Sequence, residues 1–221
     1  MRVTFALPGN RESIMTHTEP IVFVVDDDPS VLKSVDRLVR SAGYRVEVFC
    51  SAREFMRRSA HDGPACLVLD VQLPDLSGLE LQRTLAETAH SLPVIFISGH
   101  GDIPMSVRAM KSGALDFLPK PFSAEDLLRA IAAALARSRL EQQVHLETAA
   151  ARERLGRLTP REREVLCGVV AGKLNKKIAA ELGVGEKTVK VHRGRVMQKM
   201  GVHSVAELVR AAESGGVTPR V

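Results

Sequence analysis

Short apolar runs alternate with amphipathic stretches in the first part of the chain. The runs at 21–25, 66–69 and 94–97 are continuously apolar, which is typical of strands covered on both faces of a sheet. The run at 45–50 alternates polar and apolar positions, as an edge strand does, and a fifth run lies at 115–118. Between the runs, apolar side chains recur at helical spacing. The pattern predicts an α/β domain with a five-stranded parallel sheet, right-handed crossovers and helices on both faces.

The rest of the chain has helical spacing only. Residues 124–156 form one nearly unbroken helical pattern, which begins in the α/β domain and continues as a connector, either solvated or dimerising over a short stretch. Thr159 and Pro160 mark the start of the next helix, because Thr is a good N-cap and Pro is favoured in the first turn. The predicted parts are a disordered extension at 1–19, with Met1 or Met15 as the start, an α/β domain at 20–137, a helical linker at 138–157, an all-α four-helix domain at 158–214 and a disordered tail at 215–221.

Charge is shared unevenly between the two domains. Residues 1–137 hold 15 Lys and Arg against 17 Asp and Glu, a net charge of −2, whereas residues 138–221 hold 16 against 9, a net charge of +7. A basic domain suits a polyanionic partner such as a nucleic acid. The alternative is a basic surface that serves only solubility.

Composition argues against several classes of site. No apolar stretch approaches the roughly 18 residues that span a bilayer, so no membrane partner is expected. The three cysteines, Cys50, Cys66 and Cys167, are odd in number and widely spaced, which argues against a disulfide framework and a zinc site. We expect buried, reduced thiols in a cytoplasmic protein.

Polar residues stand where each of four predicted strands ends. Asp26 and Asp27 follow the first run and Asp70 follows the third, while Ser98 and Lys120 follow the last two. Ligands of parallel α/β sheets bind beyond the carboxyl ends of the strands, so these side chains are expected along one rim. Three carboxylates and one ammonium group there predict a site for a divalent metal ion and a phosphoryl group.

Mg²⁺ prefers hard oxygen ligands, usually carboxylates together with waters and a carbonyl. Asp27 and Asp70 can bind such an ion directly, and Asp26 can do so through water. The backbone carbonyl of Gln72 can supply a further oxygen. Gln72 also argues against a haloacid-dehalogenase-like phosphatase, which places a second Asp two residues after the nucleophile as acid/base. We therefore expect no enzymatic turnover of outside substrates.

The phosphoryl chemistry would centre on Asp70. Its carboxylate, screened by the ion, can attack phosphorus as a nucleophile. Lys120 would pair with one phosphoryl oxygen as a point charge, and the Ser98 hydroxyl would donate to another. The alternative is that each group is a solvated strand end or a helix cap, but five such groups at successive strand ends favour a site.

The basic domain contains a helix-turn-helix pattern. Ala179 is small enough for a second helix to approach closely, and Gly183 can adopt the positive φ that the turn needs. In the following helix Val189, Val196 and Met200 share one side, which we expect to be buried. The side chains expected to face a major groove are Lys176, Lys187, Thr188, Lys190, Val191, Arg193 and Arg195.

Four segments of the first domain carry a family pattern: VVDDDP at 24–29, LDVQLPDLSG at 69–78, ISGHGD at 97–102 and DFLPKPF at 116–122. With them the domain resembles the receiver domain of bacterial two-component response regulators. The resemblance implies a flavodoxin-like (βα)5 fold, with Asp70 as the phosphoacceptor and Ser98, Phe117 and Lys120 as switch residues. It also implies a cis peptide bond before Pro121. Phe117 can equally be a core residue; only its position three residues before Lys120 favours the switch.

Three segments of the second domain carry another pattern: LTPREREVL at 158–166, NKKIA at 175–179 and TVKVH at 188–192. The domain is similar to the LuxR-type output domain of NarL/FixJ-class regulators. Gly194 stands where relatives often carry a longer side chain, so base readout would shift to Lys190, Arg193 or Arg195. The alternatives are a basic solvent face or an RNA partner, which the absence of aromatic stacking residues disfavours.

Together the two resemblances imply a phosphorylation-dependent transcription regulator. A sensor histidine kinase would phosphorylate Asp70 with Mg²⁺, and the phosphorylated receiver would favour a homodimer that binds double-stranded promoter DNA. RNA polymerase is a further candidate partner. The alternative is a phosphorylation-independent regulator or a protein-interaction module with the same fold.

Overall fold

The computed structural model describes residues 19–86, 92–99 and 103–217. Within them the chain divides into two compact units between Arg139 and Leu140. Four predicted features lie outside the described residues. They are the extension before residue 19, the start at Met15, residues 100–102 of the receiver pattern and residues 218–221 of the tail.

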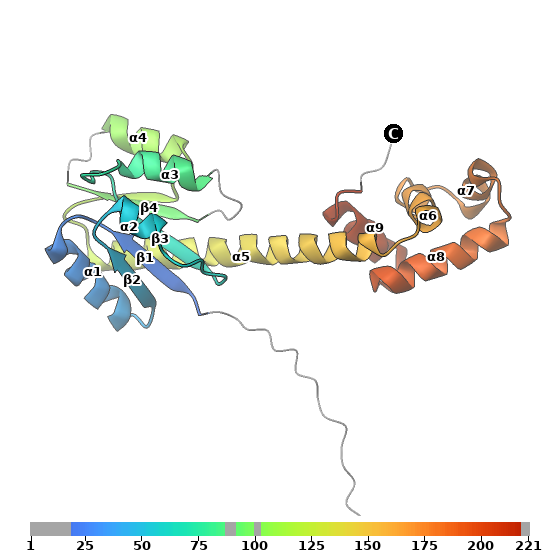
Figure 1. Ribbon diagram of the computed structural model, residues 1–221, viewed down its shortest axis with the longest axis horizontal. Helices are drawn as coiled ribbons and strands as arrows, with labels where there is room; N and C mark the ends of the chain where they lie inside the picture. The colour runs from blue at the N-terminus through green and yellow to red at the C-terminus, as the bar shows by residue number, and fades with distance from the viewer. Residues whose placement is uncertain (1–18, 87–91, 100–102, 218–221) are drawn as a thin grey trace, which may run out of the picture. The chain divides into compact units, whose positions relative to one another are not determined.

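The first unit is built on a parallel sheet in the order β2-β1-β3-β4-β5 (Figure 1). The central strand β1 is buried at all five positions, as predicted for a strand covered on both faces. The strand β2 lies at the edge, as predicted, but its burial does not alternate strictly, because Val46 and Phe49 are buried whereas Val48 is exposed. The strands are β1 (Ile21–Val25), β2 (Arg45–Phe49), β3 (Ala65–Asp70), β4 (Val94–Ser98) and β5 (Asp116–Pro119).

Helices cover both faces of this sheet. The helices α1 (Pro29–Ser41) and α5 (Ala124–Gly156) pack on one face, against side chains such as Val22, Val68 and Ile95. The helices α2 (Ala52–Met56), α3 (Gly78–Ala86) and α4 (Ile103–Lys111) pack on the other face, where Phe23 and Phe96 are buried. Successive side chains of a strand point to opposite faces of the sheet and pack in two separate cores, which is why the covered strands are apolar at nearly every position.

The cysteine prediction is only partly right. Cys66 is buried in β3, and burial raises the pKa of its thiol to about 12. Cys50 and Cys167 are exposed, because Cys50 follows the edge strand β2 and Cys167 lies on the outer side of a helix in the second unit. All three thiols are free.

The second unit contains the last part of α5 and the helices α6 (Pro160–Val170), α7 (Asn175–Leu182), α8 (Glu186–Met200) and α9 (Val205–Ser214). As predicted, Thr159 caps α6, in a capping box with Glu162, and Gly183 takes a φ of +64° between α7 and α8. The core includes Leu155 from α5, which the sequence pattern assigned to the linker.

Two further elements complete this core. In α9, Leu208 and Ala212 are buried within their own unit, and Val217, which falls in the predicted tail, packs against the same core. None of the helices within 19–86, 92–99 and 103–217 combines the length and apolar content needed to cross a bilayer.

Candidate functional site

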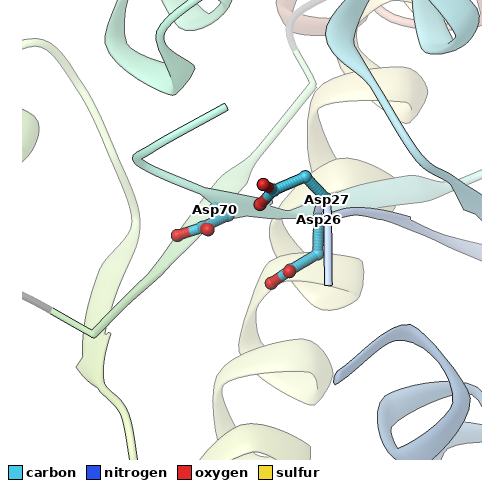
Figure 2. Close-up of side chains that lie close together, drawn as sticks. All are labelled: Asp26, Asp27 and Asp70. Carbon is cyan, nitrogen blue, oxygen red and sulfur yellow. The ribbon is translucent and has the colours of Figure 1, made fainter. Parts of the chain in front are cut away.

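Three carboxylates meet at the carboxyl ends of two neighbouring strands. Asp26 and Asp27 follow β1, and Asp70 is the last residue of β3, which pairs with β1 in parallel register. One oxygen from each carboxylate lies within 4.8 Å of the others (Figure 2). Asp26 and Asp70 are buried, whereas Asp27 is exposed. The sheet order thus brings together the three acidic residues that the sequence placed at this rim.

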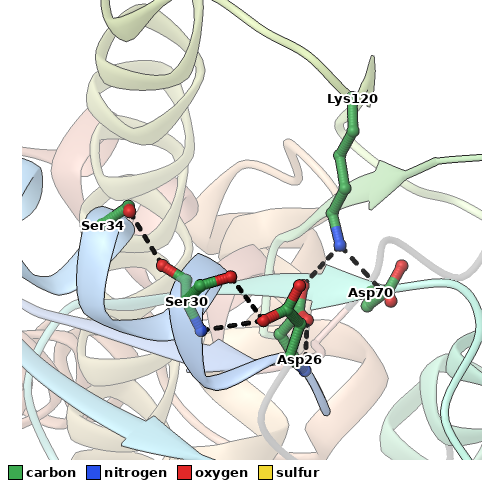
Figure 3. Close-up of polar contacts among 6 residues, drawn as sticks. Asp26, Ser30, Ser34, Asp70 and Lys120 are labelled. Carbon is green, nitrogen blue, oxygen red and sulfur yellow. Dashed lines mark hydrogen bonds and ion pairs between the residues drawn. The ribbon is translucent and has the colours of Figure 1, made fainter.

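Lys120 bridges two of these carboxylates (Figure 3). Its ammonium group lies 2.6 Å from Asp26 Oδ2 and 3.4 Å from Asp70 Oδ2. The lysine follows β5, and its backbone N–H donates to the Ser98 carbonyl at 2.7 Å. The peptide bond between Lys120 and Pro121 is cis, as the resemblance implied. One ammonium group therefore pairs with two buried carboxylates.

The charges of this cluster do not balance. With Asp26, Asp27 and Asp70 ionised and Lys120 protonated, its formal charge is −2. Burial raises the pKa of Asp70 above its usual value; Lys120 lowers that pKa, and the neighbouring Asp26 raises it further. Hydrogen bonds from the Gln72 backbone and from Lys120 also favour the ionised form but do not outweigh the burial. A divalent cation would neutralise the cluster, and carboxylate oxygens are the donors that Mg²⁺ prefers.

The loop after Asp70 has little freedom at its two ends. The Gln72 backbone hydrogen bond to Asp70 places that peptide beside the carboxylate, while the Gln72 side chain is exposed. At the other end of the loop, the Gly78 N–H donates to the Val71 carbonyl at 2.9 Å. A Cβ on Gly78 would lie 2.3 Å from the Asp70 carbonyl oxygen, so only glycine fits there.

Two of the three predicted switch residues, Ser98 and Phe117, have different surroundings. Ser98 ends β4 and is 1% exposed. Phe117 lies in β5, is partly buried and packs against the core on the side of α3 and α4. Phe117 thus contributes to this core, and its role as a switch stays a prediction.

Two aspartates near the cluster have positions that the sequence pattern did not predict. Asp28 caps α1, where its carboxylate accepts the Ser30 N–H at 2.8 Å and the Ser30 hydroxyl at 2.6 Å; these bonds lower the pKa of Asp28. Its own N–H donates to Asp26 at 2.9 Å. Asp75 bonds to the backbone of α2, more than twenty residues earlier. The Asp-Pro-Ser sequence could have indicated the first cap, but no local signal indicates the second.

The second unit presents a helix-turn-helix with a basic outer side. As predicted, Val189, Val196 and Met200 are buried on the inner side of α8. The exposed residues among the expected groove contacts are Lys176, Lys187, Thr188, Lys190, Val191 and Arg195. Lys190 lies 3.9 Å from Glu186, a distance at which an exposed pair adds little stability and leaves the lysine available.

Arg193 differs from the other expected contacts. It is only partly exposed, and its guanidinium donates to the Asn175 side-chain oxygen of α7 at 3.2 Å. Arg193 thus ties α8 to α7 in the free protein. Lys199 is also engaged, because its ammonium lies 2.7 Å from the buried carboxylate of Glu162. The basic charge of α8 is therefore divided between a free outer side and bonds within the unit.

Comparisons with known families identify both units. Residues 22–132 match the response regulator receiver domain, and residues 156–212 match the bacterial regulatory proteins of the luxR family. The chain is 49% identical to Nodulation protein W of Bradyrhizobium diazoefficiens over 201 residues, which is 91% of this chain and 88% of that protein. It is 41% identical to the Transcriptional regulatory protein FixJ of Rhizobium meliloti over 210 residues, 91% of this chain and 99% of that protein.

A solved structure agrees with these relatives. The response regulator StyR shares 46% sequence identity and a TM-score of 0.79, over 88% of this chain and 98% of that chain. Matched over nearly its whole length and in both units, the chain belongs to the response regulators that join a receiver domain to a LuxR-type DNA-binding domain, and it is a regulator of transcription.

Proposed function

We propose that Asp70 accepts a phosphoryl group from a sensor histidine kinase in the presence of Mg²⁺, and that this modification controls binding to promoter DNA. One observation carries the proposal: three carboxylates lie within 4.8 Å of one another, with one lysine bonded to two of them. Such an arrangement offers a cation site, a nucleophile and a fixed positive charge at a single rim. The free thiols are consistent with a reducing cytoplasm.

The proposed reaction uses this chain's own groups. Asp26, Asp27, Asp70 and the Gln72 carbonyl would hold the ion, which when bound offsets the negative charge that repels a phosphoryl group. An oxygen of Asp70 attacks phosphorus, and the bond between phosphorus and the kinase histidine breaks as the new oxygen–phosphorus bond forms. The imidazole nitrogen keeps the electron pair of the broken bond and takes up a proton from solvent.

Phosphorylation would then change the partners of Lys120 and Ser98. The Lys120 ammonium, which bonds to Asp26 and Asp70, would bond to a phosphoryl oxygen, and the Ser98 hydroxyl would donate to another. Movement of Ser98 would open space for Phe117 and alter the face formed by α4, β5 and α5. That face would favour a homodimer with two α8 helices for paired half-sites on DNA, where RNA polymerase is the next partner.

The proposal can be tested through DNA affinity. Double-stranded operators would first be selected from random sequence by the full-length protein, with and without acetyl phosphate. We expect acetyl phosphate and Mg²⁺ to raise the affinity of the wild-type protein for the selected operator about tenfold or more, which lies within the usual range of coupling between two sites. The Asp70→Asn protein should bind with the unstimulated affinity under both conditions.

Two outcomes would contradict the proposal. Equal affinity of the wild-type protein with and without phosphodonor would favour a phosphorylation-independent regulator. Stimulation that survives in Asp70→Asn would place the modification on another residue. Lys187→Ala is the control for the output side: it should weaken binding under both conditions without removing the stimulation, because Lys187 is exposed on α8 and far in sequence from the acceptor.

A further inference from the structure

Asp75 connects the loop after the acidic cluster to a different helix. It lies between β3 and α3, five residues after Asp70. Its carboxylate accepts the backbone N–H of Arg53 at 2.9 Å and, more weakly, that of Ala52 at 3.4 Å. Both donors belong to the first turn of α2. Burial pushes the pKa of Asp75 upward, but backbone hydrogen bonds, first from Arg53 and Ala52 and then from Asp75 and Leu76 in its own loop, together lower it, so these bonds favour the ionised carboxylate.

The α2 helix already has a cap of its own. The Ser51 hydroxyl accepts the Glu54 N–H at 3.2 Å, and the Glu54 carboxylate accepts the Cys50 N–H at 2.8 Å. These two bonds cap α2 locally, in a variant of the capping box in which the glutamate accepts the N–H of the residue before the N-cap. The bonds from Asp75 are added to this cap from a segment more than twenty residues away. They therefore restrain the position of the Asp75 loop as well as the end of α2.

The segment that Asp75 holds also contacts the other half of the cluster. The Asp26 N–H donates to the Phe49 carbonyl at 3.2 Å, and Phe49 stands two residues before Ser51. One hydrogen bond thus joins Asp26 to the end of β2, and the chain continues directly from there to the start of α2. Further hydrogen bonds join the start of α2 to Asp75. The bond between Gly78 and Val71 fixes the loop ends, and Leu73 and Leu76 pack against the core. Asp75 adds a polar restraint that joins the middle of the loop to α2.

We infer that Asp75 is a positioning residue for the cation site. By fixing the loop to α2, it holds the peptides after Asp70, including that of Gln72, in register with Asp26 and Asp27. The side chain touches neither the cluster nor a reacting atom, and it acts through the loop. The inference rests on the proposed function, because it assumes that these oxygens bind a divalent cation.

The test measures the Mg²⁺ dissociation constant of the full-length protein by calorimetry, together with hydrogen exchange of the Gly78 amide without Mg²⁺. Asp75→Ala should raise the dissociation constant about tenfold, the lower end of the effect of losing a group that supports a metal site. It should also speed exchange at Gly78. Asp75→Asn, which keeps one acceptor oxygen, should recover part of both effects.

Ser51→Ala is the matched control, because it removes one capping bond from the same helix but does not reach the loop. It should leave the Mg²⁺ dissociation constant within about twofold of the wild-type value, since the loop ligands are unmoved. Unchanged Mg²⁺ affinity and Gly78 exchange in Asp75→Ala, or an equal loss in Ser51→Ala, would overturn the inference. A wild-type protein that binds no Mg²⁺ would overturn the metal role in the proposed function as well, and so separates the two failures.

Discussion

Two buried carboxylates, one in each unit, have opposite electrostatic surroundings. Asp70 in the receiver shares one lysine with Asp26, and burial raises its pKa. Glu162 in the output domain is 3% exposed, has its own lysine at 2.7 Å and accepts the Thr159 N–H at 2.9 Å. The bond from Lys199 is the largest of the effects that lower the pKa of Glu162 to about 2.

The contrast shows how a buried charge can be assigned a role. Glu162 is neutralised within its own unit, as a structural ion pair must be to repay the cost of desolvation. The Asp26, Asp27 and Asp70 cluster leaves negative charge uncompensated at a rim that solvent can reach, a condition typical of ligand sites. A buried carboxylate thus stabilises the fold in one unit and is poised for a ligand in the other.

Loss of Lys120 should give the largest effect. Lys120→Met removes the cation bonded to Asp26, which is fully buried, and should lower the free energy of unfolding of the receiver by about 3 kcal/mol. Saturating Mg²⁺ should restore part of that loss. Urea unfolding followed by the fluorescence of Tyr44, the single tyrosine, reports on the receiver alone. In the control Arg129→Met, which breaks an exposed pair with Asp126, stability should barely change.

Loss of the Glu162 charge should have a smaller effect, confined to the output domain. Glu162→Gln should cost about 2 kcal/mol, because Lys199 keeps some contact with water. Since folding lowers the pKa of Glu162, the stabilisation is present above about pH 4.5 and is lost as pH falls toward 2. Hydrogen exchange of the amides in α6 and α8 measures this change in stability. Mg²⁺ should change neither result, and the exposed Glu164→Gln should leave exchange unaltered; a Mg²⁺ dependence would break the comparison.

Neutralising Asp70 should raise the free energy of unfolding of its domain, whereas neutralising Glu162 should lower it. Because folding raises its pKa, the ionised Asp70 costs stability at neutral pH, and this cost disappears as pH falls below the ordinary value of 3.8. Asp70→Asn should therefore stabilise the metal-free receiver, on the order of 1 kcal/mol. With Mg²⁺ at a hundred times its dissociation constant, the wild type should gain about 2.7 kcal/mol and overtake the variant. Tyr44 fluorescence during unfolding shows whether this crossover occurs; its absence would count against the cation site.

Gly194 should give the smallest effect. A Cβ added there meets nothing within 4 Å, so Gly194→Ala should stabilise α8 by roughly 0.5–1 kcal/mol. Gly168→Ala on α6 should instead destabilise the domain, because its Cβ would lie 2.8 Å from the buried Ile178 side chain. Hydrogen exchange in α8 compares the two. If Gly194→Ala also weakens operator binding, that side of α8 lies close to the duplex.

Local patterns were sufficient to predict much of the fold. The apolar runs placed all five strands, and the cap at Thr159 and the turn at Gly183 placed the helices of the output domain. The clustering of Asp26, Asp27 and Asp70 could also be predicted, because the carboxyl ends of parallel strands lie at one edge of the sheet. These features depend on spacing within a few residues or on sheet topology.

Features that depend on side-chain packing between distant segments were not predictable. The bond from Asp75 to α2 spans 22 residues, and the pair of Glu162 with Lys199 spans 37. Arg193 was expected to face a groove, yet its guanidinium donates to Asn175 of the preceding helix. The long arginine side chain can extend either toward solvent or toward a neighbouring helix. A basic residue on a recognition helix does not by itself reveal which partner it takes.

Mapping the modified residue tests the central claim most directly. The full-length protein would be treated with acetyl phosphate with and without Mg²⁺, reduced with borohydride to convert an acyl phosphate into homoserine, and digested for mass spectrometry. The site described above predicts one modified residue, Asp70, and only when Mg²⁺ is present. Modification of another residue, or of Asp70 equally well without a divalent cation, would contradict the account.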